Sequence, residues 1–268
     1  MKGTISIVVA TRNRQTDIDL LLETIAREHH PSLHEVVVVD DASDVPLHVA
    51  KHGFPVRLLR NQSQRGAAVS RNIAADLAGG DILAFLDDDA RPLPHWFTVI
   101  SRDLQTHRTA ITGRVLPFDS GVVSRARQHR YEVRYAQHQS LEPVTFFAGG
   151  NSAILRRSFL AAGGFPDVVT ASDNGLVERL AAVGEQVYFT PDLRVAHRNS
   201  KGARIALREA WRAGRLAEQS PPAHQLRRIV SAAGIQPWRD DVPAACLNVA
   251  LQAANSVAST LPRTKTPT

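Results

Sequence analysis

The stretch Asp81-Ile-Leu-Ala-Phe-Leu-Asp-Asp-Asp-Ala-Arg-Pro92 carries the strongest structural signal in the chain. Ile82 to Leu86 form an apolar run of strand length, and Asp87, Asp88 and Asp89 follow it directly. Three adjacent carboxylates repel one another, so they stay ionised only beside a cation, hydrogen-bond donors or bulk water. Open α/β sheets bind ligands at the carboxyl ends of their strands, and hard oxygen ligands suit Mg²⁺ or Mn²⁺. The stretch therefore indicates a divalent-metal site, with a solvated acidic turn as the alternative.

Composition narrows the class of protein. The chain has 268 residues, which is enough for one large domain or a domain with an elaborated tail. Its net charge of +6 would fit nucleic acid, an anionic membrane surface or a phosphorylated substrate. The single cysteine, Cys246, excludes a disulfide framework and a cysteine-based zinc site. Because Ile5 to Ala10 is too short for a signal peptide and no run is long enough to span a bilayer, we expect a cytoplasmic protein.

The first third of the chain alternates strands and helices. Apolar runs predict strands at 4–10, 36–39, 56–59 and 82–86. Helical spacing predicts helices from Thr16 to His29 and over 67–78. The order strand, helix, strand, strand, helix, strand predicts a mostly parallel sheet with helices on its faces. Asp40 and Asp41 form a second carboxylate cluster at a strand end.

Later elements are predicted in the same way. We expect a helix at 96–105, a strand at 109–116, a polar helix or loop at 118–140, a strand joined to a glycine turn within 146–154, helices at 156–162 and 176–183, a strand at 186–190 and a separate extended segment at 195–197. The tail is expected to hold helices at 203–217, 225–233 and 244–260, with frayed residues at 262–268. The first of these helices repeats arginine at three- or four-residue steps, a face suited to anions.

Seven blocks in this order resemble one known family. They are Ser6 to Arg14, Val36 to Ser43, Asn61 to Asn72, Phe85 to Pro92, Gly149 to Arg157, Gly163 to Asp167 and Val195 to His197. Together they look like the nucleotide-sugar-dependent glycosyltransferases of the GT-A fold, close to the inverting enzymes of family 2. The resemblance implies a Rossmann-like α/β fold over 1–200, with a nucleotide-sugar-binding half at 1–92 and an acceptor-side half at 93–200. A helical, basic C-terminal extension at 201–261 and a disordered tail at 262–268 would follow.

The resemblance also implies roles for individual residues. Thr11 and Arg12 would line the nucleotide cleft, Asp40 or Asp41 would bind the base, and Arg65 or Arg71 would lie near base and phosphates. Asp87 and Asp89 resemble the family's Asp-x-Asp motif: Asp87 would face the ribose, Asp88 would belong to the nucleotide-binding residues, and Asp89 and His197 would hold the metal. Gly149, Gly150 and Asn151 would approach the sugar, and Asp173 would be the catalytic base. Simpler readings stay open at this point: a polar strand end for Asp40 and Asp41, a tight turn for the glycines, a helix N-cap for Asp173, and an ordinary core or surface histidine for His197.

One region departs from the family pattern. Ser172 stands where relatives have Glu, and Gly175 stands where an acid usually follows the base. The expected activity is metal-dependent inverting transfer of a sugar from a nucleoside-diphosphate sugar, with UDP favoured, to a hydroxyl acceptor, using Mg²⁺ or Mn²⁺. The altered residues motivate the alternative of a non-catalytic nucleotide-sugar-binding or scaffold protein. The basic C-terminal helices suggest peripheral contact with the inner face of a membrane, or a homodimer. Nucleic acid is not an expected partner, because no stacking-aromatic pattern accompanies the charge.

Overall fold

The chain folds into two compact units. A computed structural model describes residues 3–28, 30–168, 172–200, 202–216 and 239–261. The first unit comprises Met1–Leu116 and His138–Ala196, and the second comprises Pro117–Gln137 and His197–Thr268. The predicted helix at 225–233 and the predicted tail at 262–268 lie outside the described residues. The predicted division into functional halves stays a prediction.

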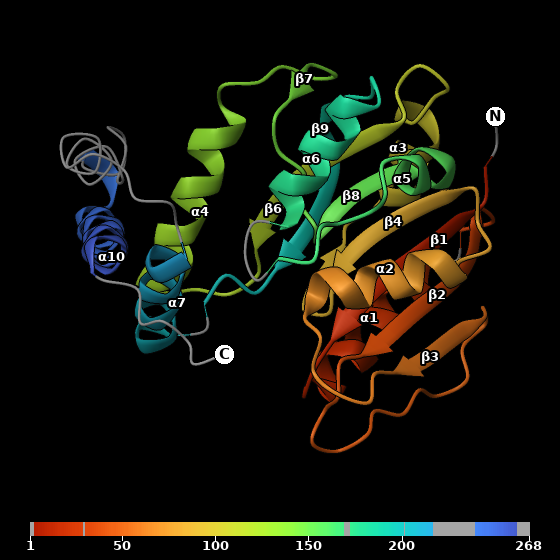
Figure 1. The fold of residues 1–268 in the computed structure, drawn as a ribbon, viewed down its shortest axis with the longest axis horizontal. Coiled ribbons are helices and arrows are strands. Elements are labelled where there is room, and N and C mark those ends of the chain that lie inside the picture. The colour runs from red at the N-terminus through yellow and green to blue at the C-terminus, as the bar shows by residue number, and fades with distance from the viewer. Residues whose placement is uncertain (1–2, 29, 169–171, 201, 217–238, 262–268) are drawn as a thin grey trace. The chain divides into compact units, whose positions relative to one another are not determined.

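Four parallel strands form one side of the sheet in the first unit (Figure 1). β1 (Ile5–Thr11), β2 (Leu33–Asp40), β3 (Val56–Arg60) and β4 (Ile82–Asp87) pair in the order β3-β2-β1-β4. In this register Thr11 pairs with Asp40, and Ala10 pairs with Asp87. The strand ends that carry the acids therefore lie at one edge of the sheet. The predicted mostly parallel α/β fold is confirmed.

The sheet continues through antiparallel strands. β8 (Asn151–Leu155) pairs with β4, and the order runs on through β6 (Ala110–Pro117), β9 (Val187–His197) and β5 (Ala90–Pro92), with β7 (Pro143–Val144) beside β9. The prediction of two segments at 186–190 and 195–197 was wrong, because β9 is one strand. Pro191 lies inside this strand and is partly buried, and Phe189, Leu193 and Val195 on either side of it are fully buried.

Helices pack on the sheet through apolar stripes. They are α1 (Gln15–Glu28), α2 (Ala67–Leu77), α3 (Trp96–Asp103), α5 (Arg156–Ala161) and α6 (Ser172–Ala182). In α1 the predicted positions Ile18, Leu21, Leu22 and Ile25 are buried. α6 begins four residues before the predicted start at Leu176, so Asp173 lies inside its first turn rather than ahead of the helix.

An aromatic cluster fixes the end of β4 against the glycine turns. Phe85 lies within 5.8 Å, 5.3 Å and 5.2 Å, between ring centroids, of Phe147, Phe159 and Phe165. Asn72 of α2 extends this contact, because its amide donates to the Phe165 carbonyl at 2.8 Å and accepts from the Phe165 N–H at 2.9 Å. The buried rings pack Phe165 against β4, and the Asn72 amide ties the Phe165 backbone to α2.

The second unit is helical where it is described. It contains α4 (Val122–Tyr135), α7 (Ala203–Leu216) and α10 (Val242–Thr260). Asp241 caps α10 by accepting from the Ala244 N–H at 3.2 Å, and it pairs with Arg125 of α4 at 2.5 Å. The hydrogen bond from Arg125 lowers the pKa of Asp241 to about 2. Among the described residues, no helix combines the length and apolar character needed to cross a membrane.

Candidate functional site

Buried acids gather where β1 and β4 end. The Thr11 hydroxyl donates to Asp88 at 2.8 Å, and the Arg14 guanidinium contacts Asp88 at 2.6 Å and Asp89 at 2.9 Å. Burial raises the pKa of the Asp88 carboxyl, and Arg14 and Thr11 oppose this without cancelling it. Arg14 thus supplies part of the positive charge that three adjacent carboxylates require. No role was predicted for Arg14, although its position three residues beyond the end of a strand, on the same sheet edge as the acids, was an available signal.

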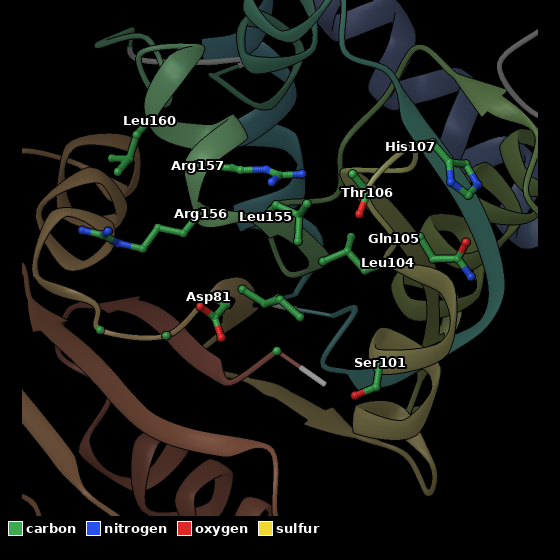
Figure 2. Close-up of a pocket in the computed structure, with 14 residues that line it drawn as sticks. Asp81, Ser101, Leu104, Gln105, Thr106, His107, Leu155, Arg156, Arg157 and Leu160 are labelled. Atoms are coloured by element: carbon green, nitrogen blue, oxygen red, sulfur yellow. The ribbon is translucent and has the colours of Figure 1, made fainter. Parts of the chain in front are cut away.

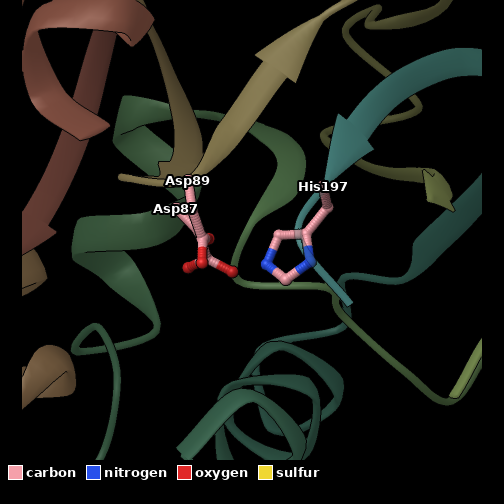
Figure 3. A group of neighbouring side chains, drawn as sticks. All are labelled: Asp87, Asp89 and His197. Carbon is pink, nitrogen blue, oxygen red and sulfur yellow. The ribbon is translucent and has the colours of Figure 1, made fainter. Parts of the chain in front are cut away.

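Two of these acids and a histidine form a candidate metal site. The ligand atoms of Asp87, Asp89 and His197 lie within 4.8 Å of one another, and Figure 3 shows both carboxylates directed toward the imidazole. Asp89 and His197 are buried, whereas the Asp87 side chain is 36% exposed. His197 is the last residue of β9, and the division between the two units falls immediately before it. Two carboxylates and an imidazole, with the Asp87 side chain partly exposed, fit Mg²⁺ or Mn²⁺ that also binds a substrate.

The predicted base lies in the same network as Asp87. Arg71 of α2 donates to Asp87 at 2.6 Å, and its other terminal nitrogen lies 3.8 Å from Asp173. The Gly149 N–H donates to Asp173 at 3.1 Å. The Asp173 side chain is 35% exposed, whereas Arg71 is buried. The structure therefore brings together a carboxylate of the metal group, a buried guanidinium, the glycine turn and a solvent-accessible carboxylate.

The glycine turn has no room for side chains. A Cβ on Gly149 would lie 2.7 Å from the Asp173 carboxylate, and a Cβ on Gly150 would overlap the Asp87 carboxylate. The next residue, Asn151, is fully buried and bonds within the protein: it accepts from the Trp96 indole at 2.9 Å and donates to two backbone carbonyls at 2.8 Å. The glycines permit a close backbone approach at the site, and Asn151 holds β8 in place behind them. Contact of these three residues with a sugar stays a prediction.

The acids at the end of β2 organise the neighbouring loops. Asp40 accepts from the Ser43 N–H at 2.8 Å and pairs with Arg60. Asp41 accepts from the Asn61 amide and from the backbone N–H groups of Arg65 and Gly66, each at 2.8 Å. Burial alone would raise the pKa of both carboxyls, but these donors outweigh it and lower both pKa values.

The two remaining predicted cations lie near this loop. Arg12 is partly exposed and donates to Gln64 at 2.9 Å, and the Arg65 side chain is exposed. Binding of a nucleotide base or its phosphates by these residues, and by Asp40 and Asp41, stays a prediction.

Asp41→Asn is expected to destabilise the fold by ~1–3 kcal/mol at neutral pH, since an amide is a weaker acceptor for two backbone donors. Because the folded pKa of Asp41 is lowered, its stabilisation is present above the unfolded value of about 3.9 and is lost as pH falls through the folded pKa. Urea unfolding of wild type and variant should differ at pH 7 and converge in acid. Asp76→Asn, on the exposed side of α2, is the matched control. A difference that stays constant down to the acid limit would contradict this assignment.

Gly175 has a structural reason to lack a side chain. A Cβ at this position would overlap the Pro166 ring, so the acid that relatives carry there cannot be accommodated without moving the loop before α6. Gly175→Ala is expected to destabilise the protein by about 1 kcal/mol or more, despite alanine's better helix propensity. Gly53→Ala, which meets nothing within 4 Å, should be close to neutral in the same urea titration. If Gly175→Ala were more stable than wild type, the overlap between the added Cβ and the Pro166 ring would not be destabilising, and this explanation would be wrong.

A further cavity of the first unit lies away from these acids. It has a volume of about 660 Å³, and Figure 2 shows Asp81, Arg156 and Arg157 among its walls. Gly3 and Ile82 place it at the amino ends of β1 and β4, the opposite edge of the sheet from the acids. None of the predicted site residues lines it. The functional argument therefore rests on the carboxylate cluster rather than on cavity size.

Comparisons with known proteins identify relatives of this chain. It is 41% identical over 86 residues to an uncharacterized glycosyltransferase of Haemophilus influenzae, a match covering 32% of this chain and 29% of the relative. It is 25% identical over 229 residues to a glucosyl-dolichyl phosphate glucuronosyltransferase of Haloferax volcanii, covering 72% of this chain and 69% of that protein. The match thus spans less than a third of the Haemophilus relative's length.

A solved structure shares the fold. The mannosyltransferase PcManGT of Pyrobaculum calidifontis, in complex with GDP-Man and Mn²⁺, superposes with a TM-score of 0.60 at 21% identity, covering 98% of this chain and 78% of that one. The likeness confirms the predicted GT-A architecture. The model of glycosyl transferase family 2 matches residues 6–163, more than half of the chain. On this match and on the arrangement of its strand-end acids, the chain is a member of glycosyl transferase family 2.

Proposed function

We propose that the chain is a metal-dependent, inverting hexosyltransferase that moves a sugar from a nucleoside-diphosphate sugar to a hydroxyl acceptor. The observation that carries the proposal is the position of Asp87. It belongs to the metal-ligand group with Asp89 and His197, and it is also bonded to Arg71, which lies beside Asp173. Asp87 therefore links the candidate metal ligands and Arg71, which are suited to binding a diphosphate, to Asp173, which is suited to accepting a proton.

Asp89 and His197, together with Asp87, are the residues that would hold Mg²⁺ or Mn²⁺. The ion, when bound, would neutralise the charge that builds on the leaving nucleoside diphosphate. Arg71 is placed to add a second positive charge there, because its guanidinium is buried and already directed at Asp87. Arg14, by pairing with Asp88 and Asp89, would keep both carboxylates in position before the donor binds.

Asp173 is the residue we assign as general base. A base must be accessible to the acceptor hydroxyl, and Asp173, whose side chain is 35% exposed, is the accessible carboxylate of this network that lies outside the candidate metal-ligand group. The Gly149 N–H and the nearby Arg71 orient its carboxylate. In inverting transfer the acceptor oxygen attacks from the face opposite the leaving group, and proton removal by Asp173 would accompany that attack. The departure at Ser172 leaves this carboxylate in place.

The donor is proposed as a class. The Pyrobaculum neighbour was solved with GDP-Man, whereas the sequence resemblance favours UDP. The nucleotide part of the donor is therefore to be identified by experiment. We would incubate the protein and Mn²⁺ with UDP-, GDP- and dTDP-sugars and follow the anomeric signals by proton NMR, with water as the default acceptor. The proposal expects release of a nucleoside diphosphate from one donor and a first-formed sugar of inverted configuration. A first-formed sugar of retained configuration would refute the inverting mechanism.

A non-catalytic nucleotide-sugar-binding protein is the second candidate. The observation favouring it is that Ser172 and Gly175 replace two acids beside Asp173. It predicts metal-dependent nucleotide binding without turnover of any donor, even in the presence of simple sugar acceptors. Loss of turnover on mutating Asp173 would decide against it.

The outer face of α7 suggests a membrane contact. Arg204, Arg208 and Arg212 are exposed, and Leu207 and Trp211 beside them are 49% and 41% exposed. Arginines next to exposed apolar side chains suit an anionic lipid surface. The protein is expected to co-sediment with phosphatidylglycerol vesicles and not with phosphatidylcholine vesicles, with binding weakened by salt and by the change Leu207→Ala with Trp211→Ala. Dimerisation without vesicle binding would instead assign this face to a second copy.

A further inference from the structure

We propose that α4 of the second unit fixes the tautomer of His197, so that the ring nitrogen facing the candidate metal site carries a lone pair. A relay of hydrogen bonds runs from Glu132 through Gln128 and Asn199 to the imidazole. All four residues belong to the second unit. The inference rests on the proposed role of His197 as a metal ligand, and it adds three positioning residues to that function.

The two nitrogens of His197 face different groups. Figure 3 shows one ring nitrogen directed toward Asp87 and Asp89, and the other, next to the ring carbon that carries the side chain, directed away from them. This second nitrogen, Nδ1, lies 3.4 Å from Oδ1 of Asn199. His197 is 6% exposed and Asn199 is 1% exposed, so protein groups rather than bulk water determine which nitrogen is protonated. A neutral imidazole has one N–H, so a proton on Nδ1 leaves Nε2 with the lone pair that a metal needs.

The direction of the hydrogen bonds is set at the far end of the relay. The Gln128 side-chain amide on α4 donates to the Glu132 carboxylate at 3.1 Å. An ionised carboxylate can only accept, so the Gln128 Oε1 faces the other way. There it accepts from the Asn199 amide at 3.1 Å, which leaves Asn199 Oδ1 facing His197. An oxygen at this place accepts from Nδ1–H, so the relay favours the tautomer in which Nε2 is unprotonated.

Backbone contacts keep Asn199 in place. The Asp119 carboxylate accepts from the Asn199 N–H at 2.8 Å and from the Ser200 N–H at 2.7 Å. Asp119 stands just before α4 and also accepts from the Ser124 hydroxyl at 3.0 Å. The segment after β9 is thereby fastened to the start of the helix that carries the relay. Loss of a partner that orients a ligand histidine typically lowers metal affinity by roughly 10- to 100-fold.

The first test is long-range proton–nitrogen NMR of the imidazole nitrogens. The full chain is measured in EDTA, at a pH raised until the pattern of a doubly protonated ring is absent, and His197→Gln identifies the His197 signals by their loss. We expect wild type to show Nδ1 protonated and Nε2 unprotonated. A spectrum with the proton mainly or equally on Nε2 overturns the proposal. No metal, donor or acceptor is needed, so this result is independent of the test of the proposed function.

Variants of α4 test the relay itself. Gln128→Leu removes the acceptor that holds the Asn199 amide, so the proton is expected to shift toward Nε2. Its affinity for Mn²⁺, measured by EPR, should fall roughly tenfold or more. Gln128→Glu keeps an acceptor facing Asn199 and should restore the wild-type tautomer and most of the affinity. Gln137→Leu, the same change at an exposed residue just after α4, is the matched control and should behave as wild type.

Glu132→Gln provides a second variant at an exposed position, where the substitution should not prevent folding. Its amide can donate as well as accept, so the direction of the relay is no longer imposed and a larger share of His197 should carry the proton on Nε2. Thermal unfolding checks that each variant folds, and Glu132→Gln decides alone if Gln128→Leu does not. The proposal is overturned if the folded variants keep the proton on Nδ1 as wild type does. Failure of wild type to bind Mn²⁺ would instead refute the metal site on which the inference rests.

Discussion

Asp173→Asn is expected to bind nucleotide and metal as wild type does and to lower sugar transfer by roughly 10²–10⁴-fold, the usual contribution of a positioned general base. Asparagine has nearly the same shape and can still accept the hydrogen bond that Gly149 N–H makes to residue 173. It cannot take a proton from an acceptor hydroxyl. The expected signature is therefore a fall in kcat with an unchanged nucleotide dissociation constant, measured by product NMR and calorimetry on the same preparation.

Asp167→Asn is the matched control, because Asp167 is an exposed carboxylate just before the segment that leads to α6. Its turnover should match that of wild type. If Asp173→Asn retained turnover within about twofold of wild type, the residue would be part of the scaffold and a different group would serve as base. Loss of nucleotide binding in Asp173→Asn would mean that the substitution had disturbed Arg71 and the glycine turn.

Asp89→Ala is expected to abolish metal-dependent nucleotide binding, with an affinity loss of at least about 100-fold in the presence of Mn²⁺. Asp89 is 2% exposed and contributes a ligand atom to the group formed with Asp87 and His197. The unliganded variant should remain folded, because Arg14 keeps its bond to Asp88 and one of three mutually repelling carboxylates is gone. Thermal unfolding without ligand checks this directly.

The control for Asp89→Ala is Asp76→Ala, the same chemical change at an exposed residue of α2. Mn²⁺ should raise the nucleotide affinity of wild type and of Asp76→Ala equally. If Mn²⁺ still raised the affinity of Asp89→Ala, the metal would be held by other groups, and the assignment of the strand-end acids would fail.

The sheet was predictable because its strands are short runs of β-branched and apolar residues that end in polar clusters. Val36 to Val39 and Ile82 to Leu86 are buried from both faces, as their unbroken apolar character implies. Parallel strands place their carboxyl ends at one edge, so the order of elements was enough to expect Asp40 and Asp87 at the same edge. The convergence of Asp87, Asp89 and His197 followed the resemblance rather than any local pattern.

The remaining features depend on contacts between distant segments. Arg14 lies 74 residues before Asp88 in the sequence, and its pairing becomes visible only when β1 and β4 are neighbours. β9 continues through Pro191 and joins two segments that the sequence analysis separated, with buried side chains on both sides of the proline. Likewise α4 has a polar sequence that gave a weak helix signal, and its partner α10 lies more than a hundred residues away.

The metal site can be tested most directly by diffraction from crystals soaked with Mn²⁺ and the nucleoside diphosphate that binds best, with data collected at a wavelength where Mn²⁺ scatters anomalously. The account predicts one anomalous peak about 2.1 Å from a carboxylate oxygen of Asp89, close to Asp87 and His197, and in contact with the diphosphate. A peak held by other residues, or a bound nucleotide with no metal at these acids, would contradict it.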